Sequence, residues 1–143
     1  PEPVATAAPP VVAPNLGAQQ TELTGNADAT LIYPVQGTII RAYAAGRNDG
    51  IDIASDAQTP VKAAAAGVVA AITTNTDGIQ IVVIRHSDNL LTVYTHLEAL
   101  TVTRDDTVSQ GQVIGQVLAG NPSYLHFEVR RGMDSADPAD FLP

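Results

Sequence analysis

The chain has 143 residues, a formal net charge of −8 and only seven Lys and Arg residues, which are scattered along the sequence. Scattered cations on an acidic chain argue against a nucleic-acid-binding protein, because phosphate contacts need clustered Lys and Arg. The chain contains no cysteine, which excludes disulfides and thiolate metal sites, so a metal ion would have to use Asp, Glu or one of the three histidines, His86, His96 and His126.

Composition divides the chain into two parts. Residues 1–14 contain five prolines, and residues 1–32 contain no Lys or Arg and little hydrophobic periodicity. Such a composition is typical of an extended linker. We therefore expect a Pro/Ala-rich linker and lead-in over residues 1–32 and one folded domain over residues 33–143, and we interpret the chain as the C-terminal part of a longer protein.

The domain is predicted to be all-β. Short runs rich in β-branched residues alternate with turn clusters such as NTDG (75–78) and SQG (109–111). Turn signals at roughly ten-residue spacing favour an antiparallel β-sandwich or barrel. The predicted strands are GTIIRAY (37–43), GVVAAITT (67–74), IQIVVIRH (79–86), LLTVYTH (90–96), QVIGQVL (112–118) and LHFEVRR (125–131).

The alanine-rich segment VKAAAAGVV (61–69) could be mistaken for a helix. Pro60 precedes it, Gly67 lies within it and a β-branched run follows, so the sequence favours a strand and a turn instead.

Alternation along the last predicted strand separates a core face from a polar face, because successive side chains of a strand point to opposite faces. The residues expected in the core are Leu125, Phe127 and Val129. The residues expected on the polar face are Tyr124, His126, Glu128 and Arg130. By the same alternation, Tyr94 and His96 are expected to share one face of the strand at 90–96.

Four segments of the domain, in order, resemble the landmarks of the lysostaphin-type (LytM) zinc endopeptidases, which cut peptide cross-links of peptidoglycan. The segments are GRNDGIDIAS…TPVKAAAAGVV (46–69), VIRHSDNLLTVYTHLEAL (83–100), VSQGQVIGQV (108–117) and LHFEVRRGMDSADPADFL (125–142). The resemblance covers about residues 33–143 and implies the all-β fold of that family.

In active members an H-x-x-x-D segment supplies two zinc ligands, and the second His of an H-x-H segment supplies the third. The first His of that pair and the His of a Y-x-H-L segment handle water and transition-state charge. The resemblance places Asp52 and His126 at ligand positions and His96 at a catalytic position. Asn48 stands where the first ligand His is expected, and Tyr124 stands at the first His of H-x-H.

These two departures affect both the metal and the proton-handling group. A catalytic zinc commonly keeps three protein ligands, and an Asn amide oxygen is a poor zinc ligand compared with imidazole. The phenol of a tyrosine, with an unperturbed pKa near ~10, is a weak general base at neutral pH. We therefore expect no bound metal, no cofactor and no catalysis. Asp49 is a less favoured substitute ligand, because a shift by one residue along a strand reverses the face.

Two further features bear on the site. His86 ends a predicted strand beside a turn, and we interpret it as a surface or turn histidine. The segment QVLAGNPSY (116–124) and the connection after RAYAAG (41–46) are shorter than the loops that wall the substrate cleft in active members. A shorter wall implies a wider groove, which suits a protein partner better than a single peptide strand.

The sequence resembles the degenerate branch of the family, whose members activate peptidoglycan amidases in the Gram-negative envelope during septum splitting. The leading hypothesis is a non-catalytic periplasmic regulator that binds a peptidoglycan hydrolase, an N-acetylmuramoyl-L-alanine amidase or similar enzyme. The residues expected to line its binding groove, with polar tips free to hydrogen-bond the partner, are Asn48, Asp52, His96, Tyr124 and His126.

Three alternatives stay open. The chain could be an active zinc endopeptidase with an unforeseen ligand, or a passive module that binds peptidoglycan itself. A preceding N-terminal region could also anchor the protein to a membrane.

Overall fold

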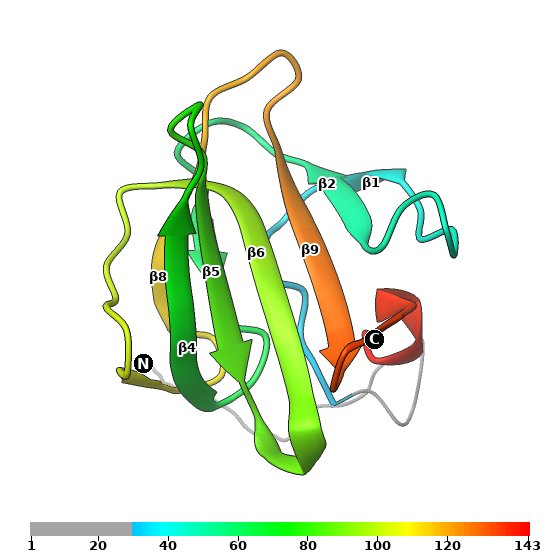
Figure 1. Cartoon of the computed structure of the whole chain (residues 1–143). Helices are drawn as coiled ribbons and strands as arrows, with labels where there is room; N and C mark the ends of the chain where they lie inside the picture. The colour runs from blue at the N-terminus through cyan, green and yellow to red at the C-terminus, as the bar shows by residue number, and fades with distance from the viewer. Residues whose placement is uncertain (1–29) are drawn as a thin grey trace.

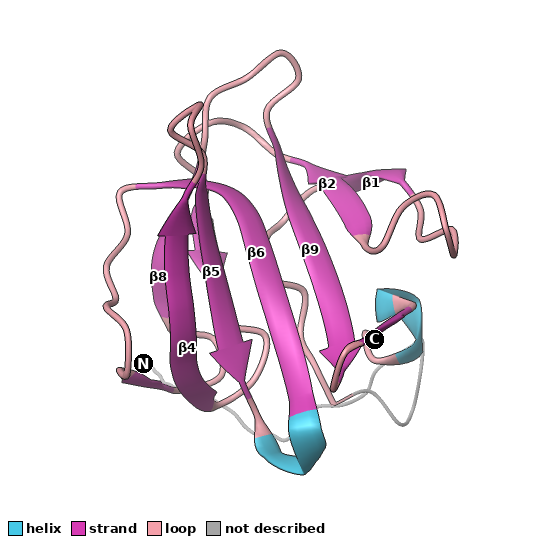
Figure 2. Cartoon of the chain, viewed as in Figure 1, coloured by secondary structure: helices cyan, strands magenta, loops and turns pink. Residues whose placement is uncertain are grey.

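The computed structural model describes residues 30–143, so most of the predicted linker lies outside the described residues. Figures 1 and 2 show a domain built from strands. The strands are β1 (Thr38–Arg41), β2 (Ile51–Ala54), β3 (Pro60–Lys62), β4 (Gly67–Thr74), β5 (Gln80–Arg85), β6 (Leu90–Glu98), β7 (Thr107–Val108), β8 (Val113–Val117), β9 (Tyr124–Arg131) and β10 (Asp134–Ala136). Residues 30–143 contain two helical segments, the 3-10 turns η1 (Ser87–Asn89) and η2 (Pro138–Asp140). Within this range, no helix has the length and hydropathy needed to cross a membrane.

Every strand pairing in residues 30–143 is antiparallel, and the main sheet has the order β1-β2-β9-β6-β5-β4-β7. Strand β10 pairs with β9, and the β3–β8 pair joins the sheet through β6. The prediction of an antiparallel all-β domain is confirmed. In the described part of the chain the sheet ends at β1 and β7, so it is not closed into a barrel.

The inner face of the sheet forms the core. Leu125, Phe127 and Val129 of β9 are fully buried, as the alternation predicts. The ring of Phe127 packs against the ring of Tyr94 at a centroid distance of 5.4 Å. Strand β8 lies behind β4 and β5 in Figure 1, and its buried residues Ile114 and Val117 join the same core. The outer face of β9 is thereby left for polar side chains.

The alanine-rich segment forms a turn between two strands, as predicted. Strand β3 ends at Lys62, β4 begins at Gly67, and Ala63 and Ala64 between them are fully buried. A Cβ atom on Gly67 would lie 2.4 Å from the backbone oxygen of Arg85. Glycine is therefore required where β4 starts beside β5.

The end of the predicted lead-in packs against the domain. Leu31 is buried, and the N–H groups of Thr30 and Leu31 both donate to the carbonyl of Phe141. The N–H of Ile32 donates to the carbonyl of Ala64. Residues 30–32 therefore hold the last turn of the chain against the core.

The predicted shared face of Tyr94 and His96 is wrong. Tyr94 is fully buried in the core, whereas the ring of His96 bonds to Tyr124 on the outer face of β9. The β5–β6 register jumps from Ile81↔Thr95 to Gln80↔Leu97, and His96 has φ of 74°. An extra residue at a β-bulge breaks the period of two and redirects the side chain.

Candidate functional site

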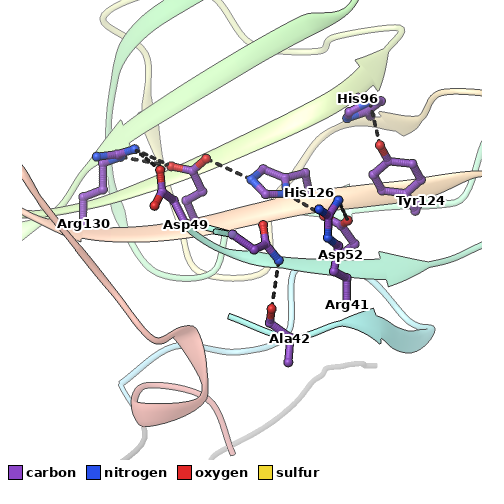
Figure 3. Close-up of polar contacts among 10 residues, drawn as sticks. Arg41, Ala42, Asp49, Asp52, His96, Tyr124, His126 and Arg130 are labelled. Carbon is purple, nitrogen blue, oxygen red and sulfur yellow. Dashed lines mark hydrogen bonds and ion pairs between the residues drawn. The ribbon is translucent and has the colours of Figure 1, made fainter. Parts of the chain in front are cut away.

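The candidate site begins where β2 pairs with β9. This pairing sets Asp52 directly opposite His126 and Ala54 opposite Tyr124. Gly50 allows the approach, because a Cβ there would lie 2.2 Å from the backbone oxygen of Phe127. Both predicted ligand positions therefore meet across one strand pair (Figure 3).

Both ring nitrogens of His126 face carboxylates. Nδ1 lies 2.5 Å from Oδ1 of Asp52, and Nε2 lies 2.9 Å from Oε2 of Glu128. A carboxylate only accepts hydrogen bonds, so both contacts require a proton on each nitrogen. His126 is thus held as an imidazolium ion between two acidic side chains.

The contacts continue on both sides of His126. Nε of Arg130 donates to Oε1 of Glu128 at 3.0 Å, and Nη2 of Arg130 forms an ion pair with the same oxygen at 2.8 Å. The Nη2 atom of Arg130 lies 3.8 Å from a carboxylate oxygen of Asp49, and Arg41 lies 3.8 Å from Oδ2 of Asp52. We call this set the ion-pair ladder, and Figure 3 shows its course across β1, β2 and β9. Its members are Arg41, Asp49, Asp52, His126, Glu128 and Arg130.

The ion-pair ladder shifts the titration of its central groups. The hydrogen bond to Glu128 raises the pKa of His126, with Asp52 adding to the effect against the opposing cost of burial. The same hydrogen bond lowers the pKa of Glu128, and Arg130 lowers it further. Both shifts favour the charged forms, which is what the paired geometry requires.

Asn48 has a structural role in the connection between β1 and β2. Its side chain is buried, and Nδ2 donates to the carbonyl of Ala42 at 2.9 Å. Its backbone forms a bridge with Ala44 in both directions. The amide therefore closes a tight backbone loop, and this hydrogen bond uses one of its two N–H donors.

His96 and Tyr124 form a second polar contact beside the ion-pair ladder. The Tyr124 hydroxyl lies 3.1 Å from Nε2 of His96, and the two rings lie 4.5 Å apart between centroids. Burial lowers the pKa of His96, and the neighbouring positive charge of His126 lowers it further. There is therefore a pH range, between the two pKa values, in which His126 is charged and His96 is neutral.

These side chains do not fit a zinc ion. An imidazole binds a metal only through a deprotonated nitrogen, and the two carboxylates that hold His126 require both nitrogens to be protonated. Asn48 is turned to the Ala42 carbonyl, and Asp49, the substitute ligand weighed from the sequence, is paired with Arg130. Among residues 30–143, no three His, Asp or Glu side chains converge as a metal-binding group.

The structure brings the five predicted site residues together in part. Asp52 bonds to His126 and Tyr124 bonds to His96, while the Asn48 side chain bonds to the backbone of its own loop. Most of their polar tips are therefore not free, although Nδ1 of His96 is buried without a hydrogen-bond partner within residues 30–143. The expectation that the five residues line one groove stays a prediction.

Three residues of the ion-pair ladder were missed as site residues by the sequence interpretation, namely Arg41, Glu128 and Arg130. The signal for two of them was present, since Glu128 and Arg130 share the polar face of β9 with His126 at a spacing of two. The pairing of Arg41 with Asp52 depends on the β1–β2 register, which includes an irregularity between Ile39 and Arg41.

His86 is separate from this site. Its Nδ1 lies 2.7 Å from the Ala66 carbonyl and its Nε2 lies 2.8 Å from the Thr92 hydroxyl. Thr92 in turn bonds to the Tyr94 hydroxyl, which accepts a hydrogen bond from the N–H of Ala64. This chain of bonds ties the turn after β5 to the buried segment before β4.

Comparison with known proteins gives the family. Residues 46–138 match peptidase family M23, the LytM-type peptidases, which confirms the resemblance seen in the sequence. The chain spans less than half the length of the curated relatives it matches, and several of these are named as lipoproteins.

Two relatives carry functional names. The murein hydrolase activator NlpD of Escherichia coli is 32% identical over 80% of this chain and 32% of its own length. The cell division protein DipM of Caulobacter vibrioides is 30% identical over 85% of this chain and 22% of its own length.

Among solved structures, a zinc-containing peptidase from Vibrio cholerae superposes with a TM-score of 0.69. The two chains are 27% identical, and the match covers 78% of this chain and 40% of the other. The shared fold therefore occurs in a protein that contains zinc.

Proposed function

The chain belongs to peptidase family M23, and we propose that it is a non-catalytic activator of a peptidoglycan hydrolase, an N-acetylmuramoyl-L-alanine amidase, during septum splitting. The names of the murein hydrolase activator and the cell division protein among its relatives support this proposal. Lipoprotein names among the relatives support a periplasmic, membrane-associated location in a Gram-negative bacterium.

The observation that carries the proposal is the ion-pair ladder. The two ligand positions that the chain retains, Asp52 and His126, are bonded to each other, and the far nitrogen of His126 is bonded to Glu128. The third position is an Asn whose amide closes a backbone loop. A site arranged in this way can hold its own strands together but offers no open metal coordination set.

The same face provides the proposed contact with the hydrolase. Asn48 and Asp52 are buried and fix the shape of this surface, while His96, Tyr124 and His126 are only partly buried. Tyr124 combines an apolar ring with a polar tip, a side chain that is enriched at interface hot spots. A hydrolase whose open form binds this surface better than its autoinhibited form would be shifted toward activity.

Stimulation of a purified amidase tests this function. In a dye-release assay of peptidoglycan digestion, the unmodified chain should accelerate the amidase while releasing no dye alone. Tyr124→Ala should weaken the interaction by ~1–3 kcal/mol without loss of folding, because Tyr124 points away from the core. Arg104→Glu is the matched control, since Arg104 is exposed in the loop between β6 and β7. If the Tyr124 variant stimulates the amidase as well as the unmodified chain does, while the Arg104 variant loses stimulation, the surface that contains Tyr124 is not the contact surface.

The second candidate function is an active zinc endopeptidase, which the likeness to the Vibrio cholerae peptidase favours. Metal analysis separates it from the activator, because the endopeptidase requires about one tightly held zinc per chain. A passive peptidoglycan-binding module would neither bind zinc nor stimulate the amidase.

A further inference from the structure

The edge of the sheet at β1 is an exposed strand. Within residues 30–143, β1 pairs only with β2, and all four of its residues are exposed. An edge strand presents unpaired backbone N–H and C=O groups, which other chains can use for pairing. Ile39 is 44% exposed and Ile40 is 50% exposed, so two large aliphatic side chains are exposed beside these groups.

Exposed apolar side chains gather on this side of the molecule. Of the five large hydrophobic residues exposed in residues 30–143, three are Ile39, Ile40 and Met133. Met133 directly precedes β10, and β10 pairs with the same edge of β9 as β2 does. The hydroxyl of Tyr43, in the connection after β1, lies 3.3 Å from the hydroxyl of Ser135 in β10. The opposite edge, β7, has no such residue, since Thr107 is polar and Val108 is buried.

The last residue of β1, Arg41, adds a positive charge to this edge. The side chain of Arg41 is 65% exposed, and its one ion pair within residues 30–143, with Asp52, is long at 3.8 Å. The other carboxylate oxygen of Asp52 is already held by His126. A guanidinium has five N–H donors, so Arg41 keeps donors for a further carboxylate.

We propose that β1 binds an extended segment of the hydrolase partner, which adds to the sheet as a further strand. Aliphatic side chains of that segment would cover Ile39 and Ile40, and a carboxylate would pair with Arg41. The inference rests on the proposed function and assigns the partner a second contact, beside the surface that contains Tyr124. Strand addition gives affinity through main-chain hydrogen bonds and specificity through alternate side chains.

Other occupants fit this edge less well. A helix satisfies its own backbone groups and would leave those of β1 unpaired. A second copy of this chain would align two strands that contain only Thr38, Ile39, Ile40 and Arg41, so Arg41 would meet no carboxylate. Two chains of net charge −8 also repel one another.

The test compares edge variants in binding to a purified N-acetylmuramoyl-L-alanine amidase. Ile40→Asp should weaken binding about tenfold and Arg41→Glu about fivefold, because each removes one contact and introduces repulsion toward a carboxylate. Thr107→Asp makes the matched change on the opposite edge strand and should alter binding by less than about twofold. In the unmodified complex, hydrogen exchange of the amides of Thr38–Arg41 should slow, which is the direct signature of strand pairing.

The outcomes separate this inference from the proposed function. The edge contact is overturned if Ile40→Asp binds the amidase as tightly as the unmodified chain. It is also overturned if amidase binding leaves amide hydrogen exchange over Thr38–Arg41 unchanged. Neither result contradicts the activator proposal. Failure of any amidase to bind the unmodified chain overturns both. If sedimentation shows that the chain forms dimers, and Ile40→Asp abolishes them, the occupant of the β1 edge is a second copy of this chain. If Ile40→Asp fails to fold, the exchange measurement on the unmodified chain decides.

Discussion

The ion-pair ladder can be tested through Glu128→Gln, an isosteric change that removes one negative charge. The Glu128 carboxylate accepts hydrogen bonds from Nε2 of His126 at 2.9 Å and from Nε of Arg130 at 3.0 Å, and it forms an ion pair with Nη2 of Arg130 at 2.8 Å. Hydrogen bonds to charged groups contribute ~1.5–3 kcal/mol each. The glutamine keeps one acceptor oxygen, and Arg130 is partly solvated, so we expect a loss of about 2 kcal/mol of unfolding free energy.

The loss should depend on pH in a defined direction. The pKa of His126 is raised in the folded state, so its ion pair stabilises the fold fully below the unfolded value of ~6.5. That contribution disappears as the pH rises through the raised pKa. Glu128→Gln should therefore destabilise the protein more at about pH 6 than at a pH above the His126 transition. Both conditions lie above the unfolded pKa of Glu128, 4.5, so its own protonation does not interfere.

Urea unfolding at the two pH values measures the effect, after NMR titration of the His126 ring has located its transition. For a domain of this size, about 2 kcal/mol corresponds to a decrease in Tm of about 8 °C. Glu98→Gln on β6 is the matched control, because its side chain has no hydrogen bond or ion pair within residues 30–143. A loss that is equal at both pH values, or below about 0.5 kcal/mol at each, would show that the ion-pair ladder does not hold His126 as an imidazolium ion.

Two further predictions concern the buried hydrogen bond of Tyr94 and the metal content of the chain. Tyr94→Phe removes the acceptor of the Ala64 N–H in the core, where burial raises the pKa of Tyr94 to about 12. The substitution should lower the free energy of unfolding by ~1–3 kcal/mol, as measured by urea unfolding. An unchanged free energy of unfolding would contradict the buried hydrogen bond. Protein purified without chelator should carry well under one zinc per chain, and Asn48→His alone should stay substoichiometric because Glu128 still holds His126. Adding Glu128→Gln to Asn48→His should tighten zinc binding, as measured by metal analysis and calorimetry; stoichiometric zinc in the unmodified chain would refute the assignment.

The long strands could be predicted from the sequence because their patterns depend on local chemistry alone. The β-branched runs and turn clusters predicted β1, β4, β5, β6, β8 and β9, and the residues flanking the alanine run correctly indicated a turn. Strands β3, β7 and β10 have two or three residues each, which is too short for a period of two to be recognised.

The site could be predicted less completely, because side-chain contacts depend on register and bulges. The family motifs identified Asp52, His126, His96 and Tyr124, and the structure bonds them in pairs. No local pattern indicates the bulge at His96, so alternation wrongly placed Tyr94 and His96 on one face. The contact between Glu128 and His126 could not be interpreted from the sequence alone, because its effect on His126 depends on Asp52 bonding to the other ring nitrogen.

The mutual bonding of the polar groups determines how a partner can use this surface. Each carboxylate of the ion-pair ladder already accepts hydrogen bonds or ion pairs, so a partner that competes for these groups must first break contacts of similar strength. Net binding energy must then come from groups that folding leaves unsatisfied or apolar. Those are the ring of Tyr124 and the aliphatic side chains of β1, which lie next to the ion-pair ladder, and the remaining donors of Arg41 at its end. The former ligand positions would thus fix the shape of the surface, and the residues around them would supply the affinity.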